Sequence, residues 1–327
     1  MCSTSTGNKN TQDKIDDGIY PFYVRSQTVE RINSWTFDGE AILTAGDGVG
    51  VGKVFHHTYG KIGVHQRVYI LSNFKCDANY LFHFFSSHFY NRVKRMSAKN
   101  SVDSVRKEMI TEMPLYLPSK QEQAKIGVLL SLLDERISTQ NKVIDKLQSL
   151  IRGIAHKISK QGKPNIRLSE CLECSSTTLQ ESDVAEVGAY PVYGANGIVG
   201  YLDTYSTTKE AIYIIKDGSG VGSVSYVKGK CSATGTLNIL EAKEGYSLRY
   251  LYFMLKVFNF EPYKTGMAIP HIYFKDYRKA KIYCPNYELQ NKCANLLYEI
   301  EQKATIEQKI LDNLCNQKQY LLRQMFI

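Results

Sequence analysis

The sequence predicts an α+β protein with an internal pseudo-twofold repeat, in which two β-rich domains are separated by two long antiparallel coiled-coil helices. Two observations predict this class. Short motifs from one half of the chain recur in the other half at a nearly constant offset, and each half ends in a long stretch of heptad spacing. The offset far exceeds the roughly 50-residue period of solenoid repeats, so we expect a whole module to be duplicated.

The duplicated motifs fall into two groups. Pro118 and Gln123 recur as Pro285 and Gln290, at an offset of 167 residues. Three other pairs share an offset of 170, and they are Tyr20–Tyr23 with Tyr190–Tyr193, Asp47–Gly52 with Asp217–Gly222, and Tyr80–Leu81 with Tyr250–Leu251.

The two β-rich heads are expected at residues 1–117 and 164–284. Both are rich in Tyr, Val, Thr and Ile in short runs with turn residues between them, which is typical of strands. Ala41–Thr44 and Ala211–Ile215 each lead into an Asp-Gly-x-Gly-Val-Gly loop that another apolar run follows, which predicts strand, glycine loop, strand. Tyr80–Met96 and Tyr250–Phe258 predict short aromatic helices.

The long helices are expected within residues 118–163 and 285–327. Apolar residues there alternate by three and four, which is typical of a coiled-coil seam, although each helix could instead pack on its own domain as an ordinary amphipathic helix. Lys318 departs from the pattern, so we expect the seam to loosen there or the side chain to reach outward. A helix of about 40 residues is ~60 Å long and would form a stiff spacer. The first seam is Ile126, Leu130, Leu133, Ile137, Gln140, Ile144, Leu147, Ile151, Ile154 and Ile158, and the second is Cys293, Leu297, Ile300, Ala304, Glu307, Leu311, Leu314, Lys318, Leu321 and Met325.

Composition narrows the functional class. The net charge is +9, and residues 51–100 carry eight Lys or Arg against one acid, Asp77. Such a concentration suits a phosphate backbone, and a solvated basic surface is the alternative. The eight cysteines do not occupy equivalent places in the two copies, which indicates free thiols in a reducing cytoplasm. The sequence contains no run of about 18 apolar residues, so it predicts no membrane span. The first residues are polar and do not have the apolar core of a signal peptide.

Familiar catalytic and metal-binding patterns are not found, so no catalytic, cofactor-binding or metal residue is predicted. A phosphate-binding loop ending at Gly52-Lys53 would need Gly at position 47, where Asp stands. The Cys171/Cys174 pair lacks the second pair that a zinc site needs. His83 and His88 are five residues apart and do not share a helix face, so we read them as aromatic packing or phosphate contacts.

Further residues carry a resemblance to a known family. These are Asn100–Lys107, Met113–Leu115 and Leu117–Ile126 after the first head, and Thr265–Ile272 in the second. With two β-rich heads each followed by a long helix, the chain resembles the specificity (S) subunit of type I restriction-modification systems, over nearly all of its length. Leu289 departs from the family's usual Glu before Gln290.

The resemblance implies a non-catalytic subunit in which each head is a target-recognition domain. Each head would read one half of a bipartite target in double-stranded DNA. The paired helices would set the spacing and dock two modification subunits, which methylate adenine, and restriction subunits with ATP-driven translocation can join. S-adenosylmethionine, ATP and Mg would then belong to the partner subunits. The alternatives are a stand-alone tandem DNA-binding protein, a structural adaptor without methyltransferase partners, and an enzyme with a cryptic site.

Candidate DNA-contacting residues are polar, carried by loops and close to the basic face. The heads differ at these positions, with Arg25 against Ala195 for example, so we expect two different half-sites. The candidates are Lys9, Asn10, Gln12, Arg25, Gln27, Lys53, His65, Gln66 and Arg67 in the first head, and Tyr193, Asn196, Lys216, Ser219, Ser223, Thr234, Thr236, Lys264 and His271 in the second.

The start of the first head looks short. Residues 165–172 precede the second head's first motif, and nothing before Met1 corresponds to them. We align Cys174–Thr178 with Cys2–Thr6 on their similar residues. The sequence thus raises the expectation of a truncated or alternatively started gene product with a weakened first head.

Overall fold

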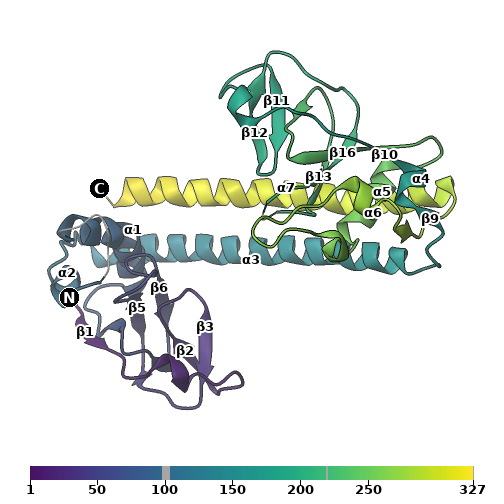
Figure 1. Ribbon diagram of the computed structural model, residues 1–327. Coiled ribbons are helices and arrows are strands. Elements are labelled where there is room, and N and C mark those ends of the chain that lie inside the picture. Colours follow the sequence, from purple (N-terminus) through teal and green to yellow (C-terminus); the bar gives the residue numbers. More distant parts are fainter. Residues whose placement is uncertain (98–103, 219, 327) are drawn as a thin grey trace. The chain divides into compact units, whose positions relative to one another are not determined.

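The computed structural model describes residues 1–97, 104–218 and 220–326 (Figure 1). The chain divides into two compact units, one of Met1–Gln140 with Ile310–Ile327 and one of Asn141–Lys309. Each unit contains one β-rich head and part of both long helices. The predicted α+β class with a duplicated module is confirmed.

The first head pairs two four-stranded sheets with a helix. One sheet has the order β1-β8-β5-β6 and the other β3-β2-β7-β4, with β2 and β7 parallel. The elements are β1 Ser3–Thr6, β2 Tyr20–Tyr23, β3 Val29–Ile32, β4 Phe37–Asp38, β5 Ala41–Ala45, β6 Phe55–Thr58, β7 Lys61–Val64, β8 Val68–Ser72, α1 Ala78–Met96 and α2 Lys107–Thr111.

Strand β5 lies at the centre of the first head because both of its faces are covered. All five of its residues are buried. Ile42 packs in one cluster with Leu81 and Phe85 of α1, whereas Leu43 packs in another with Ile62 of the second sheet. Alternate side chains of a strand point to opposite faces, so a strand between two layers needs a continuous apolar run, as this one has.

The second head repeats this plan. Its central sheet has the order β10-β16-β13-β14, and β11 pairs with β15 in parallel as β2 does with β7. The elements are β9 Ile166–Arg167, α4 Leu168–Cys171, β10 Leu172–Ser175, β11 Tyr190–Gly194, β12 Gly197–Leu202, β13 Ala211–Ile215, β14 Val224–Val227, β15 Ser232–Ala233, β16 Leu237–Ala242, α5 Leu248–Lys256, α6 Phe274–Tyr277 and β17 Lys281–Ile282.

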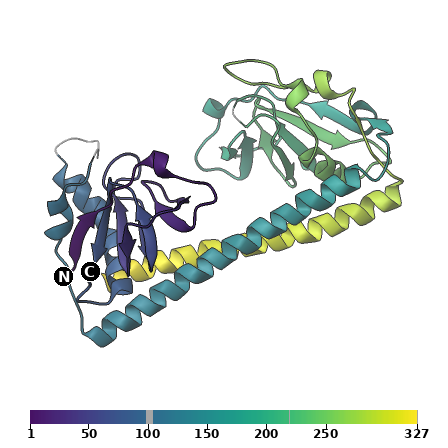
Figure 2. The same cartoon turned by 90° about the horizontal axis from the view of Figure 1, so that it is seen from below.

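The long helices are α3 (Lys120–Ser159) and α7 (Tyr287–Met325). In each unit their segments lie side by side and run antiparallel, as in Figure 2. Leu130 near the start of α3 clusters with Phe326 at the end of the chain, and Ile158 near the end of α3 clusters with Leu297 near the start of α7. Every predicted seam position is buried or half-buried, so the predicted seam is confirmed.

Lys318, which interrupts the apolar seam, forms an ion pair with Asp134 on α3. Its Nζ also donates a hydrogen bond to this carboxylate. Asp134 in turn lies 3.7 Å from Nδ1 of the buried His83. The exception in the heptad pattern is therefore explained by a polar contact that links α7, α3 and α1.

A buried glutamine joins each head to its long helix in the same way. The Gln123 side chain accepts a hydrogen bond from the Asp77 backbone nitrogen at 3.1 Å and donates one to the Pro118 oxygen at 2.7 Å. Gln290 accepts from Ser247 at 2.9 Å and donates to Pro285 at 2.8 Å. The 167-residue repeat therefore marks a duplicated junction.

The strand registers correct the alignment of the two heads at their start. Thr4 of β1 lies opposite Leu71, and Cys174 of β10 lies opposite Leu240. Leu71 and Leu240 are equivalent, because they pair with Ile42 and Ile212 in the two central strands. Thr4 therefore corresponds to Cys174, at an offset of 170. The alignment of Cys174 with Cys2 was wrong because similarity among Ser, Thr and Cys residues does not fix a register.

Candidate nucleic-acid interface

The glycine loops turn the chain between antiparallel strands, as predicted. Gly48 and Gly52 have φ values of 76° and 66°, and Gly218 and Gly222 have 94° and 89°. Residues with a Cβ rarely adopt these values. A Cβ at Gly50 would also lie 2.3 Å from the Arg25 backbone oxygen. No helix follows the loops, so they are bends that bring neighbouring loops together.

Two arginines converge on the first residue of the glycine loop in the first head. Arg25 Nη1 lies 2.9 Å from the Asp47 carboxylate, and Arg67 Nε lies 3.6 Å from it. The arginine side chains are 43% and 64% exposed, so these ion pairs stabilise the fold by under about 1 kcal/mol each. Their main effect is to hold two exposed guanidinium groups at one place. Asp47 was missed as a candidate, and its place at the head of the duplicated loop was the available signal.

His65 organises the turn that carries Arg67. It is 4% exposed, and its Nδ1 accepts a hydrogen bond from the Arg67 backbone nitrogen at 3.0 Å. Accepting through Nδ1 places the proton of the neutral ring on Nε2. Burial, and then the charge of Arg25, lowers the pKa of His65. We therefore assign His65 a supporting place behind the surface.

Other candidates of the first head extend from this cluster. Gln66 donates its backbone N–H to the Lys9 oxygen at 2.8 Å, so Lys9, Arg25, His65, Gln66 and Arg67 are brought together. The remaining candidates lie farther along the loops. Asn10 caps the 3₁₀ turn that contains Gln12, Gln27 is exposed in the turn between β2 and β3, and Lys53 stacks over the Tyr90 ring at 5.2 Å.

The second head builds the same turn from different side chains. Thr234 donates its backbone N–H to the Tyr193 oxygen at 2.8 Å, as His65 does to Tyr23 at 3.0 Å. Lys216 donates to the Thr236 oxygen at 3.0 Å, as Gly46 does to Arg67 at 2.7 Å. His65-Gln66-Arg67 thus corresponds to Thr234-Gly235-Thr236. The hydroxyl groups of Thr234 and Thr236 lie 2.8 Å apart, where the first head has a ring and a guanidinium group.

The remaining candidates of the second head lie on its other loops and strand ends. Tyr193 and Ser223 line a pocket of about 230 Å³. Asn196 lies at the exposed tip of the hairpin between β11 and β12. Lys264 forms an ion pair with Glu261 at 2.6 Å, and His271 exchanges backbone hydrogen bonds with Thr265. Ser219 lies outside the described residues.

A missed feature of the second head is an aromatic pair with a lysine. Lys230 Nζ lies 5.1 Å from the Tyr205 ring centroid and 5.7 Å from that of Tyr190. The two rings meet edge to face at 4.9 Å. The duplicated Tyr-Pro motif, which contains Tyr190, was the only signal for it.

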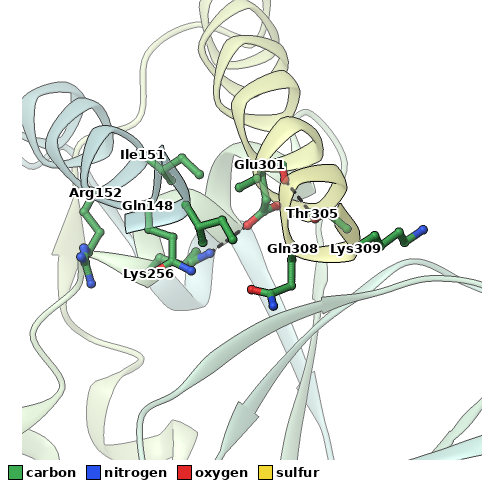
Figure 3. A pocket seen from close by; sticks show the side chains of 10 residues that line it. Gln148, Ile151, Arg152, Lys256, Glu301, Thr305, Gln308 and Lys309 are labelled. Atoms are coloured by element: carbon green, nitrogen blue, oxygen red, sulfur yellow. Dashed lines mark hydrogen bonds and ion pairs between the residues drawn. The ribbon is translucent and has the colours of Figure 1, made fainter. Parts of the chain in front are cut away.

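A groove with apolar and charged lining residues lies in the second unit between α3, α5 and α7 (Figure 3). Its volume is about 470 Å³. Glu301 is fixed in it, because Lys256 lies 2.8 Å away and the Tyr252 hydroxyl donates to it at 2.7 Å. Arg152 and Lys309 also line the groove. The carboxylate is thus committed to an internal network rather than poised for acid–base chemistry.

The described residues contain no group of three or more His, Cys, Asp or Glu that could hold a metal ion. His88 serves aromatic packing, as one of our two readings proposed, whereas the buried His83 contacts Ser131 and Asp134 as well as the Phe82 ring. His88 stacks on Phe84 with centroids 4.7 Å apart. In the parts of the chain that the structure covers, no helix has the length and apolar character that crossing a bilayer requires.

Comparison with known proteins decides the family. The profile of the type I restriction modification DNA specificity domain matches residues 2–149 and again residues 164–316. The chain belongs to the type I restriction-modification specificity family. The two matches coincide with the duplication, one on each head and the helix that follows it.

Relatives of this specificity family match in sequence and in fold. The EcoDI specificity subunit of Escherichia coli is 26% identical over 152 residues, which cover 46% of this chain and only 33% of that protein. A putative type I specificity subunit of Mycoplasma genitalium is 24% identical over 72% of this chain and 67% of its own length. The crystal structure of a type I restriction-modification S subunit from M. genitalium superposes with a TM-score of 0.78 at 19% identity, covering 100% of this chain and 94% of that one.

Proposed function

We propose that this chain is the non-catalytic DNA specificity subunit of a type I restriction-modification complex, with each head reading one half of a bipartite target in double-stranded DNA. The observation that carries the proposal is the turn before β8 and β16. The two heads hold this turn with equivalent backbone hydrogen bonds and place different side chains on it. A shared scaffold with unlike side chains is what two readers of different half-sites need.

The chemistry of the loops supports DNA as the ligand. Arg25 and Arg67 are held close together by Asp47 and remain exposed. Arginine can donate two hydrogen bonds to the edge of one guanine, and it also binds phosphates. Threonine and asparagine form hydrogen bonds with the edges of other bases. Among the candidates named above, we therefore favour Lys9, Arg25, Gln66 and Arg67 in the first head, and Tyr193, Asn196, Lys216 and Thr236 in the second.

The long helices would set the spacing between half-sites and dock two methyltransferase subunits. Exposed apolar side chains on the outer faces of the helices support docking. Leu129 of α3 is 41% exposed and Leu296, its equivalent in α7, is 50% exposed. Leu132 and Ile306 are 57% and 58% exposed. Leu129 and Leu296 share a repeated position, whereas Leu132 and Ile306 do not. A stand-alone tandem DNA-binding protein would have no need of such exposed apolar side chains.

The cofactors of the complex would belong to its other subunits. The methyltransferase subunits would bind S-adenosylmethionine, and restriction subunits, where they join, would use ATP and Mg. The complex would act on DNA in the cytoplasm.

Co-purification with the products of neighbouring genes, followed by methylome sequencing, tests the proposal. We expect two methyltransferase subunits for each copy of this chain and methylated adenines in one split target. Salt-dependent DNA binding without such partners would favour the stand-alone protein. Failure to bind DNA at low salt, with or without partners, would favour the structural adaptor.

A further inference from the structure

The loop from Thr265 to His271 in the second head presents apolar side chains to solvent at its tip. Met267 is fully exposed, and Ile269 is 68% exposed. Turn tips more often carry Gly, Asn, Asp or Ser, which suit both the backbone and water. Neither apolar side chain stabilises the core of the head, so a ligand that covers the tip would give them a purpose.

Hydrogen bonds close the base of this loop and fix its shape. The Thr265 N–H donates to the His271 oxygen at 2.9 Å, and the His271 N–H donates to the Thr265 oxygen at 2.8 Å. Gly266 has a φ value of 86°, and a Cβ there would lie 2.3 Å from the Ile269 oxygen. The loop is thus a tight closed turn that depends on a glycine, with Met267 held at its tip.

The same loop is joined to the residues of the candidate nucleic-acid interface. Gly218 of the glycine loop donates its N–H to the Pro270 oxygen at 3.0 Å, and Ile272 donates to the Lys216 oxygen at 2.9 Å. Lys216 in turn donates its N–H to the Thr236 oxygen. The apolar tip is therefore continuous with the glycine loop and with the turn whose side chains differ between the two heads.

Cations follow the loop directly along the chain. The rings of His271 and Tyr273 have centroids 5.2 Å apart, and Lys275 Nζ lies 5.2 Å from the Tyr273 centroid. Residues 272–279 contain three exposed Lys or Arg side chains and one acidic residue. This charge favours a polyanion, rather than an apolar protein surface, as the ligand that covers the tip.

We propose that Met267, with Ile269 beside it, is a wedge that enters the DNA duplex at the half-site of the second head and partly unstacks one base step. This inference rests on the proposed DNA-reading function. Proteins that deform DNA insert apolar side chains such as Met and Ile between bases in this way. Pyrimidine–purine steps unstack most easily, so the wedge selects such a step without a hydrogen bond to a base. The cations that follow the loop bind the neighbouring phosphates.

The test uses the full chain with the partners that co-purify with it, and a target found by methylome sequencing or binding-site selection. The intact target duplex is compared with duplexes that carry one nick at each step of the second half-site, because a nick lowers the cost of unstacking. We expect the wild type to bind one nicked duplex several-fold more tightly than the intact one, at a step away from the methylated adenine. 2-Aminopurine placed beside that step should become brighter on binding.

Three variants assign this preference to the loop. Met267→Gln should bind the nicked and intact duplexes equally, without the fluorescence increase, whereas Met267→Leu should behave as the wild type. Val187→Gln changes another exposed apolar residue of the same head, ahead of the start of β11, and should also behave as the wild type. Because Met267 and Val187 are exposed, the Tm of each variant should stay unchanged.

The outcomes separate this proposal from the function on which it rests. Sequence-specific binding without a preference for any nicked duplex, or a preference that Met267→Gln retains, would overturn the wedge and leave the DNA-reading function standing. A wild type that binds no specific DNA would overturn both. Loss of partner subunits from Met267→Gln in the absence of DNA would instead make the loop a protein contact, which also overturns the wedge.

Discussion

The Gln290 side chain accepts a hydrogen bond from the backbone nitrogen of Ser247 at 2.9 Å, between the end of β16 and the start of the long helix α7. The same side chain donates to the Pro285 oxygen at 2.8 Å, so one 2% exposed amide ties helix, loop and head together. Its counterpart Gln123 makes the same two contacts. The junction is therefore built from side-chain chemistry that both copies share.

Replacing this glutamine should destabilise the protein beyond a surface change. Gln290→Ala leaves the buried Ser247 N–H and the Pro285 oxygen without their partner, which we expect to cost about 1–3 kcal/mol. Urea unfolding monitored by circular dichroism measures the free energy. Lys292→Ala, at a 70% exposed side chain two residues away, is the matched control and should change it by less than about 0.5 kcal/mol. Equal losses for both variants would contradict the junction's role.

The arginine pair of the first head should contribute to DNA affinity in a salt-dependent way. If Arg67 contacts a phosphate, Arg67→Ala should make the negative slope of log K against log salt shallower by about 1. If it reads a base, it should instead relax the selected half-site sequence. Lys14→Ala removes a charge that is already paired with Glu30 at 2.9 Å and is the control. Unchanged affinity, slope and sequence preference in Arg67→Ala would remove this residue from the interface.

His83 should make the stability of the first unit depend on pH. Burial lowers its pKa from 6.5 to about 4, with Lys318 acting in the same direction and Asp134 opposing. The unfolded chain then binds a proton that the folded chain does not, so this contribution is present above pH 6.5 and is lost as the pH falls toward 4. His83→Phe, which introduces the residue found at the equivalent position 253, should flatten the pH dependence of the unfolding free energy between pH 6.5 and 4. An identical pH profile for the variant would refute the assignment.

The charge of Lys318 should have a measurable effect on the pKa of His83. Lys318→Met removes a cation that lowers the pKa of His83, so that pKa should rise. Histidine titration by nuclear magnetic resonance measures it. Because the ion pair with Asp134 is partly exposed, we expect the stability to fall by no more than about 1 kcal/mol. Arg136→Met, at an exposed neighbour on α3, should leave the His83 titration unchanged.

Alanine substitutions at two glycines can distinguish the stability cost of backbone strain from the cost of steric crowding. Gly52 has φ 66°, and a Cβ there would meet the Tyr90 ring at 3.0 Å, whereas Gly60 has φ 82° and open space around it. Gly60→Ala should cost about 1 kcal/mol through strain alone. Gly52→Ala should cost more, and thermal unfolding of the two variants compares them. Equal losses of stability in the two variants would show that the structure around Tyr90 adjusts to the added Cβ without cost.

The sequence predicted what depends on repetition and periodicity. The heptad spacing located both seams because helix packing imposes its period on the chain. The duplicated glycine loop predicted two antiparallel strand pairs, since the φ values there exclude most other residues. The ion pair of Lys318 with Asp134 could not be predicted from the sequence. The two residues are 184 positions apart, and they come close only because the helices pack antiparallel. The convergence of Arg25 and Arg67 on Asp47 was equally hidden, since it follows from sheet topology.

Each long helix carries an acidic residue at the same repeated position, but the lysine that pairs with it comes from a different element in each copy, so exchanging the two heads would disturb both pairs. Asp134 and Glu301 are equivalent at the 167-residue offset, yet Asp134 takes its lysine from α7 and Glu301 takes Lys256 from its own head. A copy of the second head in the first position would bring two ammonium groups to one carboxylate. A copy of the first head in the second position would leave Glu301 facing Ser86 in place of Lys256. An exchange of the two heads would therefore alter the charge balance at Asp134 and Glu301 unless position 318 or 256 changed as well.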